Sequence, residues 1–146
     1  MSRRSSIVKA LAEKFKDIDG TNGYNLNLFG NVYPKLKFWD EVNDFPAVYM
    51  VAGQEQREYH PGGFTWAFLD VSIKAYVRKE DSPQDDLELL LEDLERCINL
   101  NRVLVYDQTN GYDTTEILVN SIITDEGLLN PYAVGEINVQ VRYALM

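Results

Sequence analysis

The chain has 146 residues, 45% hydrophobic and 25% charged, which is the composition of an ordinary folded domain and not of a disordered segment. Its 23 acidic residues outnumber 14 Lys and Arg, and the net charge of -9 argues against a surface built to grip nucleic acid phosphates. A lone cysteine excludes an internal disulfide framework and favours an intracellular origin, while no apolar run is long enough to cross a bilayer.

The N-terminal residues predict an amphipathic helix that Ser5 or Ser6 would cap. Its apolar stripe recurs at helical spacing and consists of Val8, Leu11, Ala12, Phe15 and Ile18. Asp19-Gly20 and Asn22-Gly23 are turn signals that end it. Residues 24–44 show no sustained period, so we expect a short strand followed by an irregular connection there.

Two long strand patterns follow, over residues 47–59 and 65–79, and the short link between them predicts an antiparallel hairpin. The second strand alternates strictly. One face is apolar and carries Ala67, Leu69, Val71, Ile73, Ala75 and Val77. The other is aromatic and charged and carries Trp66, Phe68, Asp70, Ser72, Lys74, Tyr76 and Arg78. A hairpin of this length can project beyond the body of the domain.

A second helix is signalled at Ser82-Pro83-Gln84-Asp85, where the serine is placed to cap, the proline to occupy the first helical position and the aspartate to complete a capping box. Its core stripe consists of Leu87, Leu90, Leu91, Leu94 and Ile98. Its acidic residues are expected on the opposite, solvated side, and they are Asp85, Asp86, Glu88, Glu92, Asp93 and Glu95.

Strands are expected at residues 103–106, 116–124 and 136–145, the last alternating strictly. The order helix, strands, helix, strands is not that of a parallel doubly wound sheet. We therefore predict a single α+β domain over residues 1–146, with a mainly antiparallel sheet, a long β-hairpin and two α-helices packed on one face.

The sequence offers little that could carry catalysis, a cofactor or a metal. His60, the only histidine, fits a solvated turn, and Cys97 fits a small buried side chain in the helix. The loop that starts at Asp17 lacks the glycine and the final glutamate of a calcium loop, because Asn22 and Leu28 stand at those positions. We expect no enzyme, no cofactor and no metal site.

The aromatic strand face leaves two interpretations open. In one interpretation its aromatic side chains pack beneath other elements, and in the other they form a protein interface, in which Trp, Tyr and Arg are favoured. The aromatic residues are Trp66, Phe68 and Tyr76, interleaved with Lys74 and Arg78. Stacking on nucleic acid bases is disfavoured by Asp70 within that face and by the negative net charge.

A series of short motifs spans the middle of the chain. These are Phe38-Trp39-Asp40-Glu41, Asp44-Phe45-Pro46-Ala47-Val48, Glu58-Tyr59 and Pro61-Gly62-Gly63-Phe64, followed by the leucine-rich acidic helix. The series resembles the tail terminator proteins of long-tailed bacteriophages. The resemblance implies a structural virion protein at the head-proximal end of the tail, assembled in the host cytoplasm. Such proteins form a ring, usually of six subunits, that caps the tail tube, stops its polymerisation and presents a docking surface to the head connector.

The resemblance also implies a lumen through which DNA passes without specific binding, and no membrane contact. The tip of the hairpin is then expected to contact a neighbouring subunit or the tube. Our candidate interface residues are Tyr59, His60, Pro61, Gly62, Gly63, Phe64, Trp66, Phe68, Tyr76 and Arg78. Three alternatives stay open at this point: a head-tail completion or neck protein, a small metal-dependent hydrolase that uses acid pairs such as Glu88 and Glu92, and a host-side binding module.

Overall fold

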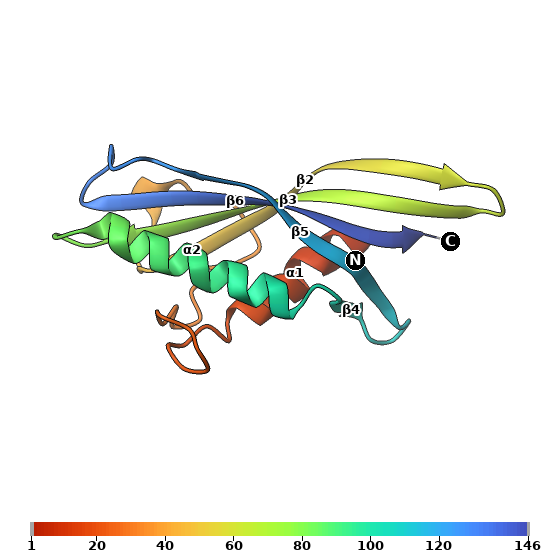
Figure 1. Cartoon of the computed structure of the whole chain (residues 1–146), viewed down its shortest axis with the longest axis horizontal. Helices are drawn as coiled ribbons and strands as arrows, with labels where there is room; N and C mark the ends of the chain where they lie inside the picture. The colour runs from red at the N-terminus through yellow and green to blue at the C-terminus, as the bar shows by residue number, and fades with distance from the viewer. Residues whose placement is uncertain (1, 146) are drawn as a thin grey trace.

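The computed structural model describes residues 2–145 and shows a twisted six-stranded sheet with two α-helices beside it (Figure 1). The helices are α1 (Arg3–Phe15) and α2 (Pro83–Leu100), and a short 3-10 helix, η1, spans Trp39–Glu41. The strands are β1 (Val32–Tyr33), β2 (Ala47–His60), β3 (Phe64–Arg78), β4 (Val105–Asp107), β5 (Tyr112–Thr124) and β6 (Tyr132–Leu145). No helix within this described range has the length and apolar character needed to span a membrane.

The strands lie in the order β1-β2-β3-β6-β5-β4. Every neighbouring pair is antiparallel except β1 and β2, which run parallel and are joined only at Val32↔Val48 and Tyr33↔Tyr49. β6 therefore lies in the middle of the sheet, paired with β3 on one side and β5 on the other. The expected small α+β domain, dominated by an antiparallel sheet with a long hairpin, is confirmed.

The main core forms on the face of β3 that the alternation marked as apolar. Leu69, Val71 and Ile73 from that face lie in one buried cluster with Leu11 of α1 and Leu90 of α2. Gly135 of β6 lets α2 approach, because a Cβ built at that position would lie 3.1 Å from Leu91 Cδ2 and 3.2 Å from Leu87 Cδ1. The two apolar stripes predicted for the helices are the residues that this core buries.

The first helix begins earlier than predicted. Its N-cap is Ser2, whose side chain accepts a hydrogen bond from the backbone N–H of Ser5 at 3.1 Å. Ser5 and Ser6, the predicted caps, lie inside the helix. A long-range contact explains the extra turn, because the Arg3 guanidinium donates to the carbonyl of Ala144 at 2.9 Å and stacks over Tyr112.

The predicted capping box at the second helix is absent. Ser82 does occupy the N-cap position, but its backbone is left-handed (φ 56°, ψ 52°), and its side chain makes no capping hydrogen bond with the described residues of α2. The chain must reverse between Arg78 at the end of β3 and Pro83 at the start of α2, and the left-handed residue makes that reversal. Turn geometry therefore overrides the local capping preference.

The acidic side of α2 is also less uniform than predicted. Asp93 is only 1% exposed, and its carboxylate accepts hydrogen bonds from the backbone N–H groups of Asn25 at 2.8 Å and Leu26 at 2.9 Å. It holds the segment after α1 against the second helix. Asp85, Glu88 and Glu92 remain exposed, as expected for a solvated face.

Candidate functional site

The hairpin formed by β2 and β3 extends beyond both helices at one end of the molecule (Figure 1). β6 supports β3 only as far as Thr65, which pairs with Leu145, so the turn itself stands clear of the sheet. Gly62 and Gly63 both have positive φ, +86° and +80°, a conformation that side chains with a Cβ rarely adopt. A Cβ at either glycine would have no described atom within 4 Å, which makes the turn a free, well-defined tip.

Aromatic side chains gather on one face of this tip. Phe64 and Trp66 meet edge to face with ring centroids 4.9 Å apart, and His60 lies 6.0 Å from Phe64. The Arg142 guanidinium of β6 sits 4.5 Å from the centre of the Trp66 ring. These contacts orient half-buried aromatic rings while leaving part of each exposed, as suits a recognition surface.

Tyr59 points to the other face of the hairpin, opposite Thr65, and 75% of its surface is exposed. His60 is exposed on the aromatic face, where its Nε2 lies 2.6 Å from the Glu58 carboxylate. The tip therefore presents apolar and polar groups on both faces. Exposed aromatic side chains beside polar ones are the composition that protein interfaces favour.

Two of the ten candidate interface residues lie away from the tip. Tyr76 is 3% exposed and belongs to a second core with Val42, Ala47 and Tyr49, and its hydroxyl donates to the carbonyl of Lys37 at 2.6 Å. Burial raises the pKa of Tyr76 to about 12. Arg78 lies over the Tyr132 ring at the end of the sheet remote from the hairpin. The aromatic strand face is thus divided: Tyr76 packs under the connection, whereas Trp66 and Phe68 remain partly open.

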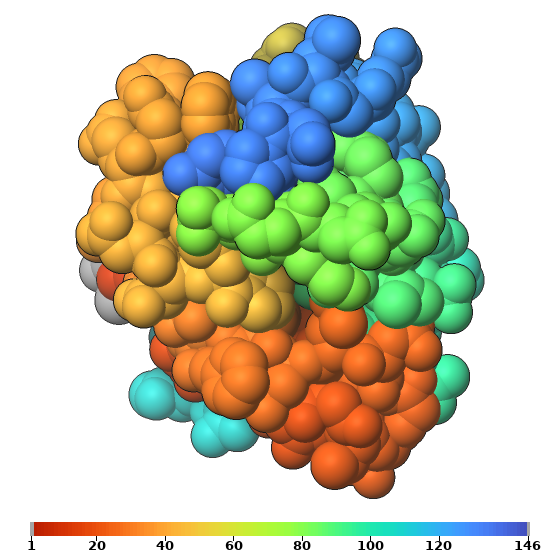
Figure 2. All heavy atoms as spheres, turned by 90° about the vertical axis from the view of Figure 1, so that its left-hand side faces the viewer, coloured from red at the N-terminus to blue at the C-terminus, as the bar shows by residue number. Residues whose placement is uncertain are grey.

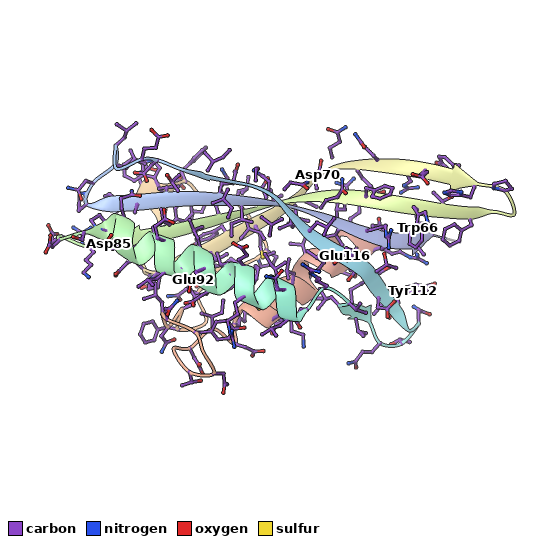
Figure 3. The ribbon with its side chains drawn as sticks, viewed as in Figure 1. Trp66, Asp70, Asp85, Glu92, Tyr112 and Glu116 are labelled. Atoms are coloured by element: carbon purple, nitrogen blue, oxygen red, sulfur yellow. The ribbon has the colours of Figure 1, made fainter. Side chains whose placement is uncertain are left out.

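The residues considered for catalysis or metal binding do not converge. Figure 3 shows Trp66 on the hairpin, and Asp85 and Glu92 well apart from it on α2. No group of three or more His, Cys, Asp and Glu side chains within residues 2–145 is placed to hold a metal ion. Cys97 is 1% exposed, and burial raises the pKa of its thiol, so it resembles a core residue more than a nucleophile.

Asp19, considered for a calcium loop, accepts hydrogen bonds from the backbone N–H and the hydroxyl of Thr21. These hydrogen bonds, and above all the one from the Thr21 hydroxyl, hold the pKa of the Asp19 carboxyl below its ordinary value. Asp19 thus stabilises the turn that follows α1, the structural role that its neighbours predicted.

A buried carboxylate at the base of the hairpin escaped prediction. The Glu55 side chain is only 5% exposed, and it accepts a hydrogen bond from the Tyr143 hydroxyl at 2.5 Å and pairs with Arg57 at 2.7 Å. The register of β2 shifts between Ala52 and Glu55, and this shift turns Glu55 toward the helix side of the sheet. Gly53 was the available signal, because an isolated glycine within a strand pattern often marks a bulge.

Three comparisons with known proteins place this fold in a family. A family model described as "Bacteriophage Tail Tube Terminator Protein" matches residues 1–146. The chain belongs to this family.

A relative in the family is the tail tube terminator protein p142 of Escherichia phage T5, 36% identical over 152 residues that cover 98% of this chain and 94% of p142. A solved structure titled "Virion of native gene transfer agent (GTA) particle" contains a chain with the same fold, with a TM-score of 0.61 over 95% of each chain at 10% identity. The resemblance seen in the sequence is confirmed, and this terminator-family chain is a structural protein of phage tail assembly.

Proposed function

We propose that this chain forms a ring, of six copies as the family resemblance implies, that caps the tail tube, halts its polymerisation and offers the head connector a docking surface. The observation that carries the proposal is the hairpin tip, because a projecting turn with oriented aromatic rings can reach a partner without rearranging the core. The contacts that such a ring needs are extended surfaces, and a catalytic pocket has no part in them.

The tip residues Tyr59, His60, Pro61, Gly62, Gly63 and Phe64, together with Trp66 and Phe68, form the proposed contact with the tube or a neighbouring subunit. Trp, Tyr and Phe are enriched in protein interfaces, and Tyr59 is 75% exposed. Tyr76 is buried within the subunit, and we assign it to the second core.

The opposite end of the molecule is a broad surface and not a projection. Figure 2 shows this end, where the connection before β2 (orange), the turn between β5 and β6 (blue) and the region around the start of α2 (green) lie side by side. It includes exposed apolar side chains such as Phe38, 74% exposed, and Leu128, 86% exposed. A surface at the far end from the tip suits the proposed contact with the head connector.

The charge of the chain supports the proposed passage of DNA. Each copy carries a net charge of -9, so a ring of copies is strongly negative overall, and we propose that its lumen shares that sign. Such a wall repels phosphates and does not retain them, because binding to DNA depends on Lys and Arg that displace counterions.

The decisive experiment removes the gene from its phage and supplies it again from a plasmid, with tail length measured by electron microscopy. Loss of the protein should give overlong tails without heads, and the wild-type plasmid should restore normal particles. Tails of normal length carrying heads in the absence of the protein would overturn the proposal.

Variants refine the same assay. Tyr59→Ser should fail to restore normal tails although the subunit folds, because it removes an exposed ring from the tip. Leu100→Ser is the matched control, since Leu100 is 66% exposed at the end of α2, away from the hairpin. Equal rescue by both variants would remove the tip from the proposed contact.

A further inference from the structure

The chain contains two Asn-Gly pairs, Asn22-Gly23 and Asn110-Gly111, and both lie exposed in turns. Such a pair reacts slowly in water, because the backbone nitrogen of the glycine attacks the side-chain amide carbon of the asparagine. Glycine favours the attack, since it has no Cβ to shield its nitrogen. How fast each pair reacts therefore depends on how firmly the fold holds the attacking nitrogen and the side-chain amide.

Hydrogen bonds hold both reacting groups of the Asn110-Gly111 pair. The Asp107 carboxylate accepts from the backbone N–H of Asn110 at 3.1 Å and from its side-chain amide at 2.9 Å. The Gly111 N–H, which would have to attack, donates to the carbonyl of Gln108 at 3.3 Å. These bonds must break before the amide carbon and the glycine nitrogen can meet, so this turn is protected.

The Asn22-Gly23 pair has no such restraint. Within the part of the chain that the structure describes, neither the Asn22 side-chain amide nor the Gly23 N–H makes a hydrogen bond. The loop is fixed on either side of the pair, by the carboxylate of Asp19 before it and by that of Asp93 after it. It projects from the helix side of the molecule, away from the sheet (Figure 1). The pair is thus a free stretch between two anchored points.

A cation lies directly against this pair. The Arg96 guanidinium of α2 donates to the backbone carbonyl of Asn22 at 3.4 Å, and a Cβ built at Gly23 would lie 2.8 Å from Arg96 Nη2. The guanidinium also lies 5.9 Å from the centre of the Tyr24 ring, which keeps it over the loop. Negative charge develops on the glycine nitrogen and then on the amide oxygen during the attack, and a nearby cation stabilises it.

We propose that Asn22 is a site of spontaneous deamidation, promoted by Arg96, and that the fold protects Asn110. The Gly23 nitrogen loses its proton to solvent and bonds to the Asn22 side-chain carbon. The bond from that carbon to the amide nitrogen breaks, and ammonia leaves with a proton taken from water. Water then opens the resulting succinimide at one of its two carbonyls. Residue 22 becomes an aspartyl residue or an isoaspartyl residue, in which the main chain runs through the side chain.

Both products change the loop in a defined way. Each carries a new carboxylate beside Arg96, which gains an exposed ion pair. The isoaspartyl product also lengthens the main chain by one carbon between the segments that Asp19 and Asp93 hold. The inference depends on this loop alone and stands whether or not the proposed ring forms.

The test follows both pairs in one sample. The full-length protein is incubated at mildly alkaline pH in heavy-oxygen water, and mass spectrometry follows the tryptic peptides of residues 17–35 and 103–142. Asn22 should convert about tenfold faster than Asn110, whose hydrogen bonds must first break. The converted peptide should contain one solvent oxygen. In urea, where the fold no longer distinguishes the pairs, the two rates should become similar.

Variants test the two causes separately, after circular dichroism has shown that each is folded. Asp107→Ala should raise the rate at Asn110 toward that at Asn22, whereas Asp107→Asn keeps an acceptor oxygen and should retain most of the protection. Arg96→Gln should slow conversion of Asn22 by about fivefold, the effect of one unit charge at about 4 Å in water. Lys79→Gln is its matched control, because it removes a positive charge beside the first turn of α2.

An Asn22 that stays unmodified in the folded protein would overturn the proposal, as would conversion of Asn110 at the same rate or faster. Equal rates for Arg96→Gln and Lys79→Gln would overturn the promotion by Arg96. Asn110 that stays as slow in Asp107→Ala as in the wild type would overturn its protection by Asp107.

Discussion

The buried carboxylate of Asp93 on α2 holds Asn25 by two hydrogen bonds, 2.8 Å from its backbone nitrogen and 3.1 Å from its side-chain amide. A third bond comes from the backbone N–H of Leu26 at 2.9 Å. The interaction joins residues 67 and 68 positions apart and fixes the segment between α1 and β1 against the second helix.

Replacing Asp93 should destabilise the fold strongly. Asp93→Ala removes a buried carboxylate and leaves the backbone N–H groups of Asn25 and Leu26 without their acceptor, so we expect the free energy of unfolding to fall by about 3 kcal/mol. Glu92→Ala, at the exposed neighbouring position, should change it by less than about 0.5 kcal/mol. Urea unfolding followed by circular dichroism measures both, and equal midpoints for the two variants would contradict the role of Asp93.

Substitutions at the two N-cap positions, Ser2 and Ser82, should change the stability of the protein in opposite directions. Ser82 has a left-handed backbone and contributes no capping bond to the described part of α2, so Ser82→Gly should stabilise the protein by about 1 kcal/mol. Ser2 does cap α1, so Ser2→Ala should destabilise it by about 1 kcal/mol. Thermal melts of the two variants beside the wild type should shift in opposite directions. A Ser82→Gly variant that melts below the wild type would show that the serine side chain contributes after all.

The aromatic tip should tolerate charge without unfolding. Trp66 is half-buried against Phe64 and Arg142 on the face away from the main core, so Trp66→Glu should reduce the free energy of unfolding by only about 1 kcal/mol while it abolishes binding to tail tubes. Co-sedimentation with purified tubes measures the binding.

Leu69→Glu sets the comparison for Trp66→Glu, because Leu69 is fully buried on the other face of β3 and its replacement should unfold the subunit. If Trp66→Glu unfolds the protein to the same extent, Trp66 belongs to the core and not to an interface.

Acid should weaken the turn between β5 and β6. Burial acts to raise the pKa of Asp125, but hydrogen bonds from the Gln84 side chain and from the backbone N–H groups of Val134 and Leu129 outweigh it and hold the pKa below the ordinary 3.8. A depressed carboxyl pKa contributes stability that is complete above the unfolded-state pKa and disappears as the pH falls through the folded-state value.

The advantage of the wild type over Asp125→Asn should therefore be constant at neutral pH and shrink below about pH 4. Urea unfolding from neutral pH to about pH 3 follows this difference. Glu126→Gln serves as the control, because Glu126 is exposed in the same turn. An advantage that persists unchanged to the acid end of the range would show that the Asp125 charge does not stabilise the turn.

Sequence reasoning succeeded where the signal was local. The leucine stripe of α2 and the alternation of β3 and β6 repeat with the period of their own element, so the buried faces could be assigned from neighbours in the chain. The hairpin could be placed because Pro61, Gly62 and Gly63 separate two strand patterns within a few residues.

Sequence reasoning failed for residues whose hydrogen-bond or packing partner lies far away along the chain. Asp93 looked like its solvated neighbours because its partners, Asn25 and Leu26, precede it by more than sixty positions. Tyr76 and Trp66 occupy the same strand face, and only the path of the connection, which passes over Tyr76 at Lys37, separates a core residue from an open one. The register shift that buries Glu55 depends on how β2 pairs and not on its own pattern.

The central position of β6 has a consequence for synthesis. β6 is made after every other strand, yet it alone joins β3 to β5. A nascent chain whose translation stops before Tyr132 lacks β6, so the facing edges of β3 and β5 have no strand to pair with. Such a fragment cannot form the native sheet, and incompletely folded chains of this kind are substrates of cellular proteases, so we expect only full-length subunits to be available for assembly.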